Sequence, residues 1–244
     1  MHRKGGLMKR VLIQLCVLLL VLTSCSFPPL KRKPDIIHHD PPVLSVDDSY
    51  FISTKCYNDL SCLPDGLIST NPQYDHLGKA SDMLGGLTPS VPLAVLTSNW
   101  YQTIPDVQFL YVKPCLSTRH VRYVVRVEGE LVLLDSVESM AAVYAPIESV
   151  EEALSYALAA TGYSAVYDLE STPNLKLLVE PLEETYVAET PDGYTVHLFD
   201  TFLCGCGPHV IRSIEVQVSR EGKVTQSQPV DAFRDPAIDD LCVD

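Results

Sequence analysis

The sequence predicts an α+β protein in which one main helix packs on an antiparallel β-meander, preceded by a smaller β-rich, loop-rich region. Residues 149–161 combine a helix start signal with apolar residues at helical spacing. After Gly162 the chain carries only short strand-forming runs separated by turn signals. Within residues 213–219 polar and apolar residues alternate, which suits an antiparallel sheet with one solvated face.

The chain begins with a secretion signal. Basic residues within the first ten positions precede an apolar run over residues 11–22. A helix of this length spans roughly 18 Å, whereas the hydrocarbon core of a bilayer is ~30 Å thick. We therefore expect residues 1–24 to be a signal peptide and not a membrane-spanning helix.

The signal ends in Leu22-Thr23-Ser24-Cys25. This tetrapeptide resembles the bacterial lipobox, in which a leucine and two small residues precede a cysteine. The resemblance implies cleavage before Cys25 and attachment of acyl chains to it. The body would then lie outside the cytoplasm, anchored to a membrane of the cell envelope. Ser26 in the next position favours the outer membrane in a diderm host.

Residues 25–42 are expected to form the lipidated cysteine and an extended linker. The stretch from Ser26 to Pro42 contains five prolines, which restrict φ and remove backbone donors. The basic triplet at residues 31–33 either meets anionic headgroups or is simply solvated. His38-His39-Asp40 lies on this segment, where a preorganised metal site is not expected.

Residues 43–135 are expected to form the β-rich, loop-rich region. Turn signals dominate residues 45–90, so this part is predicted to be irregular and held by Cys56 and Cys62. Apolar and polar residues then alternate over 120–127, which predicts a half-buried strand. A turn at 128–130 leads into a second strand over 131–134.

Residues 136–244 are expected to hold the helix and the antiparallel sheet. A short helix over 136–144 should end before Pro146. Ser149 and Glu152 then form a capping box for the main helix, and Gly162 ends it. Its apolar stripe consists of Val150, Ala153, Leu154, Ala157 and Leu158. The strands expected after it cover residues 163–169, 175–179, 185–190, 194–200, 210–219 and 223–227.

This element order, with the helix start Glu151-Glu152-Ala153, resembles the PepSY and cystatin-like helix-on-sheet modules of bacterial envelope proteins. The resemblance covers residues 146–227. It implies a module that binds or inhibits other proteins, including peptidases, without catalysing a reaction. No inhibitory loop of such modules can be matched to residues of this chain.

An even number of cysteines remains after Cys16 leaves with the signal and Cys25 takes the lipid. The six are Cys56, Cys62, Cys115, Cys204, Cys206 and Cys242. In an exported chain they favour disulfides, although six cysteines allow 15 pairings. A short Cys56–Cys62 loop is plausible. Cys204 and Cys206 are too close for a relaxed bridge, so they should bond Cys115 and Cys242 in either order.

The segment FLCGCGPH, residues 202–209, also supports a different hypothesis. Thiolates and imidazoles bind zinc or copper, and the candidate ligands are Cys204, Cys206, His209 and His197. Structural zinc sites usually place two residues between the cysteines, whereas only Gly205 separates them here. The disulfide interpretation is therefore preferred, with a metal site as the alternative.

Charge and missing motifs narrow the function. Without residues 1–25 the chain carries 14 basic and 31 acidic residues, a formal charge of −17. Nucleic-acid binders show the opposite, basic footprint. The motifs G-x-S-x-G, H-E-x-x-H, G-x-x-x-x-G-K-[ST] and G-x-G-x-x-G are all missing. We expect a non-catalytic module that binds a protein or peptide; the alternatives are a metal-binding lipoprotein and an unrecognised hydrolase.

Overall fold

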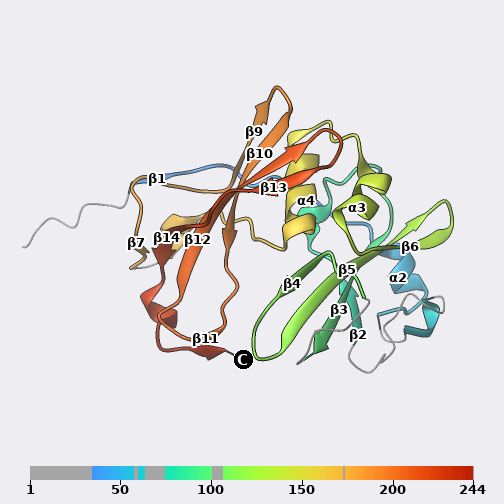
Figure 1. Cartoon of the computed structure of the whole chain (residues 1–244), viewed down its shortest axis with the longest axis horizontal. Helices are drawn as coiled ribbons and strands as arrows, with labels where there is room; N and C mark the ends of the chain where they lie inside the picture. Colours follow the sequence, from blue (N-terminus) through green and yellow to red (C-terminus); the bar gives the residue numbers. More distant parts are fainter. Residues whose placement is uncertain (1–34, 58–59, 64–74, 101–106, 173, 244) are drawn as a thin grey trace, which may run out of the picture. The chain divides into compact units, whose positions relative to one another are not determined.

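Two antiparallel sheets enclose helix α4 (Val150–Thr161) in the computed structural model of the chain (Figure 1). The structure describes residues 35–57, 60–63, 75–100, 107–172 and 174–243, and residues 34–244 form one compact unit. The predicted α+β class is confirmed. The signal peptide, the lipobox and the basic triplet at 31–33 lie outside the described residues. Within those residues, no helix is both long and apolar enough to cross a membrane.

The first sheet precedes α4 in the chain. Its strands are β2 (Asp75–Lys79), β3 (Leu93–Trp100), β5 (Thr118–Val127), β4 (Tyr111–Lys113) and β6 (Glu130–Leu134). They are ordered β2-β3-β5-β4, and β6 also pairs with β5. The predicted hairpin of β5 and β6 is confirmed, with Glu128 and Gly129 at positive φ in its turn. Val121, Tyr123 and Val125 project from β5 into the core that contains α4.

The second sheet follows α4. Its strands are β7 (Lys176–Leu177), β9 (Tyr186–Thr190), β10 (Gly193–Asp200), β12 (Val210–Ser219), β13 (Val224–Gln226) and β14 (Val230–Arg234). They are ordered β7-β14-β12-β10-β9, and β13 also pairs with β12. Val196 lies opposite Val216, and Leu198 lies opposite Ile214. These apolar pairs belong to the same core as α4.

The main helix has the predicted extent but not the predicted environment. Ser149 Oγ accepts a hydrogen bond from Glu152 N at 3.1 Å, and Gly162 ends the helix with φ 68°. Every residue from Glu152 to Thr161 is buried, so α4 lacks the solvated face of an amphipathic surface helix. The predicted apolar stripe is only part of the buried surface, because α4 contacts both the second sheet and residues 82–84 of the preceding part of the chain. Val150 is 41 % exposed.

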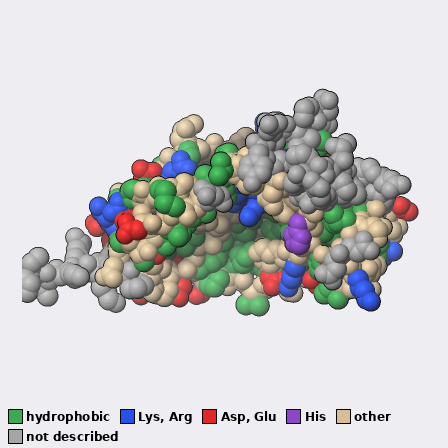
Figure 2. All heavy atoms as spheres, turned by 90° about the horizontal axis from the view of Figure 1, so that it is seen from below, with side chains coloured by type: hydrophobic (Ala, Val, Ile, Leu, Met, Phe, Trp, Pro, Cys, Tyr) green, Lys and Arg blue, Asp and Glu red, His purple; other side chains and the backbone are tan. Residues whose placement is uncertain are grey.

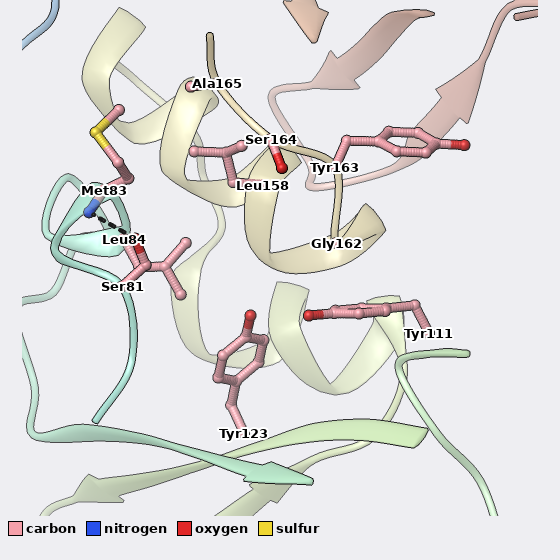
Figure 3. A pocket seen from close by; sticks show the side chains of 10 residues that line it. All are labelled: Ser81, Met83, Leu84, Tyr111, Tyr123, Leu158, Gly162, Tyr163, Ser164 and Ala165. Carbon is pink, nitrogen blue, oxygen red and sulfur yellow. Dashed lines mark hydrogen bonds between the residues drawn. The ribbon is translucent and has the colours of Figure 1, made fainter. Parts of the chain in front are cut away.

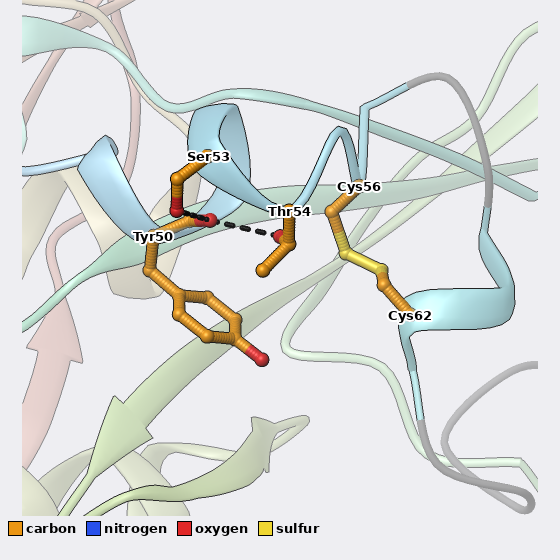
Figure 4. The surroundings of a disulfide bond; sticks show 5 residues. All are labelled: Tyr50, Ser53, Thr54, Cys56 and Cys62. Carbon is orange, nitrogen blue, oxygen red and sulfur yellow. Dashed lines mark hydrogen bonds between the residues drawn. A yellow bond between two sulfur atoms is a disulfide. The ribbon is translucent and has the colours of Figure 1, made fainter.

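Shorter elements complete the part before α4. Helix α3 (Val137–Tyr144) begins at a capping box of Ser136 and Ser139, which confirms the short helix expected there. Residues 45–90, predicted to be irregular, contain α2 (Ser49–Ser53) and β2 besides the turns η1 (Leu60–Cys62) and η3 (Asp82–Leu84). Cys56, just after α2, is bonded to Cys62 (Figure 4). This disulfide lies beside a second apolar cluster that includes Phe51 and Val124.

The chain around the second sheet departs most from prediction. Residues 163–169 do not form the expected strand: Ser164 makes one bridge to Phe199, and the turn η4 (Leu169–Ser171) follows. The remaining short elements are β1 (Ile36–Ile37), β8 (Leu182–Glu183), β11 (Gly205–Cys206), η5 (Pro236–Ile238) and β15 (Cys242–Val243). Strand β1 pairs in parallel with β8. The expected linker 25–42 therefore includes a segment that is docked on the body.

Candidate functional site: a cleft beside the cysteine-rich segment

The six cysteines pair as three disulfides. Their Cα–Cα distances are 5.5 Å for Cys56–Cys62, 5.6 Å for Cys115–Cys204 and 4.1 Å for Cys206–Cys242. Cys204 and Cys206 thus take different partners, and the structure chooses one of the two orders that the sequence left open. One bridge joins the FLCGCGPH segment to the loop after β4, and the other joins it to the C-terminal segment.

The glycines and the histidine of this segment have structural roles. Strand β11 pairs with β15 beside the Cys206–Cys242 bridge. Gly205 has φ 77°, and a Cβ atom on Gly207 would overlap the backbone of Asp239. His209 is 7 % exposed, and its Nε2 lies 2.9 Å from the carbonyl oxygen of Leu241. The segment is therefore closely fitted to the C-terminal residues.

The four candidate metal ligands do not converge. The sulfur atoms of Cys204 and Cys206 are in separate disulfides, so neither is a free thiolate. His197 lies on β10, where its Nδ1 is 2.6 Å from Glu215 Oε1. Among the residues that the structure describes, no three histidine, cysteine or carboxylate side chains are grouped as metal ligands would be.

A cleft of about 490 Å³ lies beside the FLCGCGPH segment. Its walls come from the end of β4, from the end of α4 with Tyr163, and from residues 200–212. The lining residues are Val112, Lys113, Pro114, Thr161, Tyr163, Asp200, Phe202, Leu203, Cys204, Cys206, Pro208, His209, Val210 and Arg212. Figure 2 shows hydrophobic side chains gathered in a hollow near the middle of the lower face of the molecule.

Cations outnumber carboxylates in this cleft although the protein as a whole is acidic. Arg212 Nη2 lies 2.8 Å from Asp200 Oδ2, so these two charges compensate each other. Lys113 Nζ lies 5.4 Å from the centre of the Phe202 ring and has no ion-pair partner within the described ranges. Burial lowers the pKa of the Lys113 ammonium group, and the more distant Asp200 carboxylate acts against this. Lys113 is thus a partly desolvated cation on an aromatic surface.

A second cavity, of about 350 Å³, borders the cleft at Tyr163 (Figure 3). The phenol groups of Tyr111 and Tyr123 point into the space below the end of α4. Tyr123 is 5 % exposed, and burial raises its pKa well above the ordinary value. None of the described residues that line the cavity carries a formal charge. They are Ser81, Met83, Leu84, Tyr111, Tyr123, Leu158, Gly162, Tyr163, Ser164 and Ala165.

A buried trio on the first sheet contains the residue types of a hydrolase triad but not its geometry. Asp75, Ser98 and His120 are neighbours on β2, β3 and β5. The Ser98 hydroxyl donates to the Asp75 carboxylate, and His120 Nδ1 faces the Ser98 carbonyl oxygen at 3.3 Å. Since the imidazole does not face the hydroxyl and Ser98 is 0 % exposed, this arrangement does not activate a nucleophile.

Several cleft residues were not singled out from the sequence. Lys113, Tyr163 and Arg212 come from three separate parts of the chain, and no local spacing links them. The sequence offered one signal for Lys113. It lies two residues before Cys115, which was an expected disulfide partner of Cys204 or Cys206. Comparisons of the chain with protein-family models, with curated proteins and with solved structures found no match.

Proposed function

We propose that this protein is a lipid-anchored, extracytoplasmic envelope protein whose body binds a peptide segment of another protein without catalysing a reaction. The secretion signal and the lipobox-like Leu22–Cys25 support the anchoring. The resemblance of residues 146–227 to PepSY and cystatin-like modules supports a binding role. The cleft beside the FLCGCGPH segment is the proposed binding site.

The observation that carries the proposal is the position of the Lys113 ammonium group over the Phe202 ring, in a protein whose net charge is negative. The formal charge of the whole chain is −13. Acidic ligands are therefore repelled by most of its surface, whereas the cleft offers an ammonium group that forms no ion pair with any residue the structure describes. A carboxylate that reaches Lys113 would form a charge-assisted hydrogen bond in a partly desolvated place. The cleft thus favours a ligand with an acidic side chain or a free C-terminal carboxylate.

The neighbouring cavity indicates a second feature of the ligand. Tyrosine hydroxyl groups and apolar side chains line this cavity, and its lining within the described part of the chain contains no charged residue. An ionised group would lose its hydration there without compensation, so an uncharged side chain is favoured. Because Tyr163 borders both hollows, one extended peptide can place a carboxylate near Lys113 and an apolar side chain in the cavity.

The disulfide between Cys115 and Cys204 supports a preformed site. Cys115 follows β4, which supplies one part of the lining, and Cys204 belongs to another part. A covalent link between these two parts limits their separation before the ligand arrives. Less conformational entropy is then lost on binding than with a flexible site.

The proposal is tested by selecting peptides from a random displayed library on the oxidised protein. We expect an enriched consensus that combines an acidic residue with an uncharged apolar one. Lys113→Glu should weaken binding of a consensus peptide about tenfold or more, because it replaces attraction by repulsion. Lys176→Glu on β7 is the matched control, with the same charge change at an exposed position outside the cleft. Equal binding by the wild type and the Lys113 variant would overturn the proposal.

A further inference from the structure

The chain that leads into the body is held along the edge of β8. Strand β1 runs parallel to β8, with Ile36 opposite Leu182. Leu182 N donates to the carbonyl oxygen of Asp35 at 2.9 Å, and Glu184 N donates to that of Ile37 at 3.0 Å. Ile36 packs against the apolar cluster that contains Leu182. A pairing of two residues is short, so other contacts must contribute to holding the segment.

Two adjacent histidines supply those contacts. His38 Nδ1 lies 3.1 Å from Glu184 Oε1, and His38 Nε2 lies 3.4 Å from Glu170 Oε1. His39 Nε2 lies 3.0 Å from Glu183 Oε1, and its backbone N–H donates to Glu184 Oε2 at 3.2 Å. Glu184 is 1 % exposed and also accepts a hydrogen bond from the backbone N–H of Leu169 at 2.7 Å. Its carboxylate is therefore held by the body of the protein as well as by the segment.

The protonation state of His38 decides whether both contacts are favourable. Each of its ring nitrogens faces a carboxylate oxygen, and only the imidazolium ion carries a proton on both nitrogens. A neutral ring can donate to one glutamate and presents a lone pair to the other. Loss of the proton therefore converts one attractive contact into a repulsive one.

The remaining titratable groups described around the two histidines are tyrosines, another glutamate and His197. Tyr186 packs on the His39 ring with 5.2 Å between centroids. On its other side Tyr186 faces His197 at 5.2 Å, and its hydroxyl donates to Glu215 at 3.4 Å. Tyr167 lies near enough to Glu184 for that carboxylate to contribute to raising its pKa, mainly a result of burial. Among the described residues, the ion pairs of this segment involve glutamates alone.

We propose that residues 35–39 are a proton-controlled latch, which is docked on β8 while His38 is protonated and is released when His38 becomes neutral. The hydrogen bond to Glu184 is the main cause that raises the His38 pKa in the docked state. The stabilisation is therefore fully present below the free-histidine value, about 6.5. It is lost as the pH rises through the higher, docked-state pKa.

Release would change the reach of the proposed tether. With the latch docked, residues 26–34 separate Cys25 from the body and span at most roughly 30 Å. After release, the next fixed point is Val46–Asp47, where Val46 is buried and Leu93 N donates to Asp47 O at 2.9 Å. The chain from residue 26 to residue 45 then spans at most roughly 70 Å. The latch would thus set how far the binding cleft can move from the membrane, whatever ligand the cleft takes.

Amide hydrogen exchange on the full chain in detergent tests the latch. The informative amides are Leu182 and Glu184, which donate to the docked segment. After correction for intrinsic exchange, we expect their protection factors to fall by roughly two- to fivefold between about pH 5.5 and pH 8, the effect expected of partly exposed ion pairs. Amides of β10 and β12 serve as internal controls. Equal protection of Leu182 and Glu184 at both pH values would overturn the proposal.

Variants separate the proton switch from simple loss of contacts. His38→Gln with His39→Gln should give low protection at both pH values. His38→Lys keeps a positive charge throughout this range, so protection should stay high at about pH 8. His76→Gln, on the exposed side of β2, is the matched control and should leave the pH dependence intact. Persistence of the pH dependence in the double glutamine variant would also contradict the latch.

Discussion

Glu152 is a carboxylate that caps helix α4 from inside the protein core. The residue is 3 % exposed, and its Oε2 accepts a hydrogen bond from Glu148 N at 2.8 Å. Its Oε1 has no hydrogen-bond partner within the described part of the chain. Burial raises the pKa of this carboxyl group, against the effect of the backbone donors around it. Glu152 was predicted from the sequence as a capping residue. In the structure it is also a buried acidic residue, because the part of the chain before α4 covers it.

The raised pKa of Glu152 predicts a specific pH dependence of stability. Between the unfolded pKa, about 4.3, and the raised folded value, the folded state binds more protons. Stability should therefore fall as the pH rises through this window, and Glu152→Gln should remove that part of the slope. Urea unfolding of the wild type and of Glu152→Gln measures the free energy of unfolding from about pH 4 to pH 7. Relative to the wild type, the variant should become more stable as the pH rises. Glu151→Gln, at an exposed position in the same turn, is the control; a constant difference for Glu152→Gln would contradict this prediction.

At the scale of elements, short strand pairs depend on covalent links. β11 and β15 pair over only two residues each, and the Cys206–Cys242 bridge lies within that pair. The Cys115–Cys204 bridge crosses from the first sheet to the segment after β10. These bridges hold parts of the fold in which few backbone hydrogen bonds are available. They also build the walls of the cleft.

Removing a disulfide should destabilise the protein more when the loop that the disulfide closes is longer. The sequence separations are 6 for Cys56–Cys62, 36 for Cys206–Cys242 and 89 for Cys115–Cys204. In the chain-entropy model the expected losses are about 2, about 4 and about 4.5 kcal/mol, respectively. Urea unfolding of the three double serine variants measures them. The reverse order would show that loop closure does not determine the contributions of these bridges.

The same bridges distinguish the structural interpretation of FLCGCGPH from the zinc or copper alternative. Protein exported and purified without reductant should show no alkylatable thiol among the six cysteines and no stoichiometric metal. Thiol alkylation with mass spectrometry, combined with metal analysis of the same sample, makes this measurement. Free Cys204 and Cys206 with about one equivalent of metal would favour the alternative.

At the scale of the whole molecule, charge and proposed anchoring act together. The chain after residue 25 has a formal charge of −17, so an anionic membrane surface repels the body. The proposed acyl chains at Cys25 supply the opposing attachment, at ~0.8 kcal/mol for each buried CH₂ group. With the proposed anchor and latch, the length of chain between them would set the distance at which these effects balance.

The proposed anchoring predicts that membrane association depends on the sulfur atom of Cys25. Cys25→Ser should move the protein out of the membrane fraction or leave its signal uncleaved, because the attachment atom is lost. Cys16→Ser, within the signal, is the matched control and should not change the distribution. Fractionation with intact-mass measurement checks both, and the mature wild type should begin at an acylated Cys25. Membrane association of an unmodified mature protein would contradict the prediction.

Local patterns predicted local structure well. Ser149 and Gly162 located α4 to within one residue, and alternation located β5 and β12. Strand β10 matches a predicted strand-forming run to within one residue. These signals depend on residues close in sequence. The burial of both faces of α4 did not follow from them, because it requires η3 and the residues after it to pack against a helix that lies later in the chain.

The candidate site could be predicted only in part. The two cysteines of FLCGCGPH, separated by one glycine, indicated a junction with two partners, and the structure places such a junction in the cleft wall. Lys113 and Arg212 join the site through tertiary packing, which leaves no sequence spacing to recognise. The parallel pairing of β1 with β8 was not predicted, because five prolines in residues 26–42 favoured an extended linker. An extended segment can also pair with the edge of a strand.

Mapping the binding surface by NMR tests the central claim most directly. A peptide selected for binding would be titrated into isotopically labelled, oxidised protein while backbone amide shifts are recorded. The cleft model predicts that the largest shift changes cluster on Val112, Lys113 and residues 202–212, with further changes around Tyr123. Largest changes on another face, or binding that leaves the cleft amides unshifted, would contradict it.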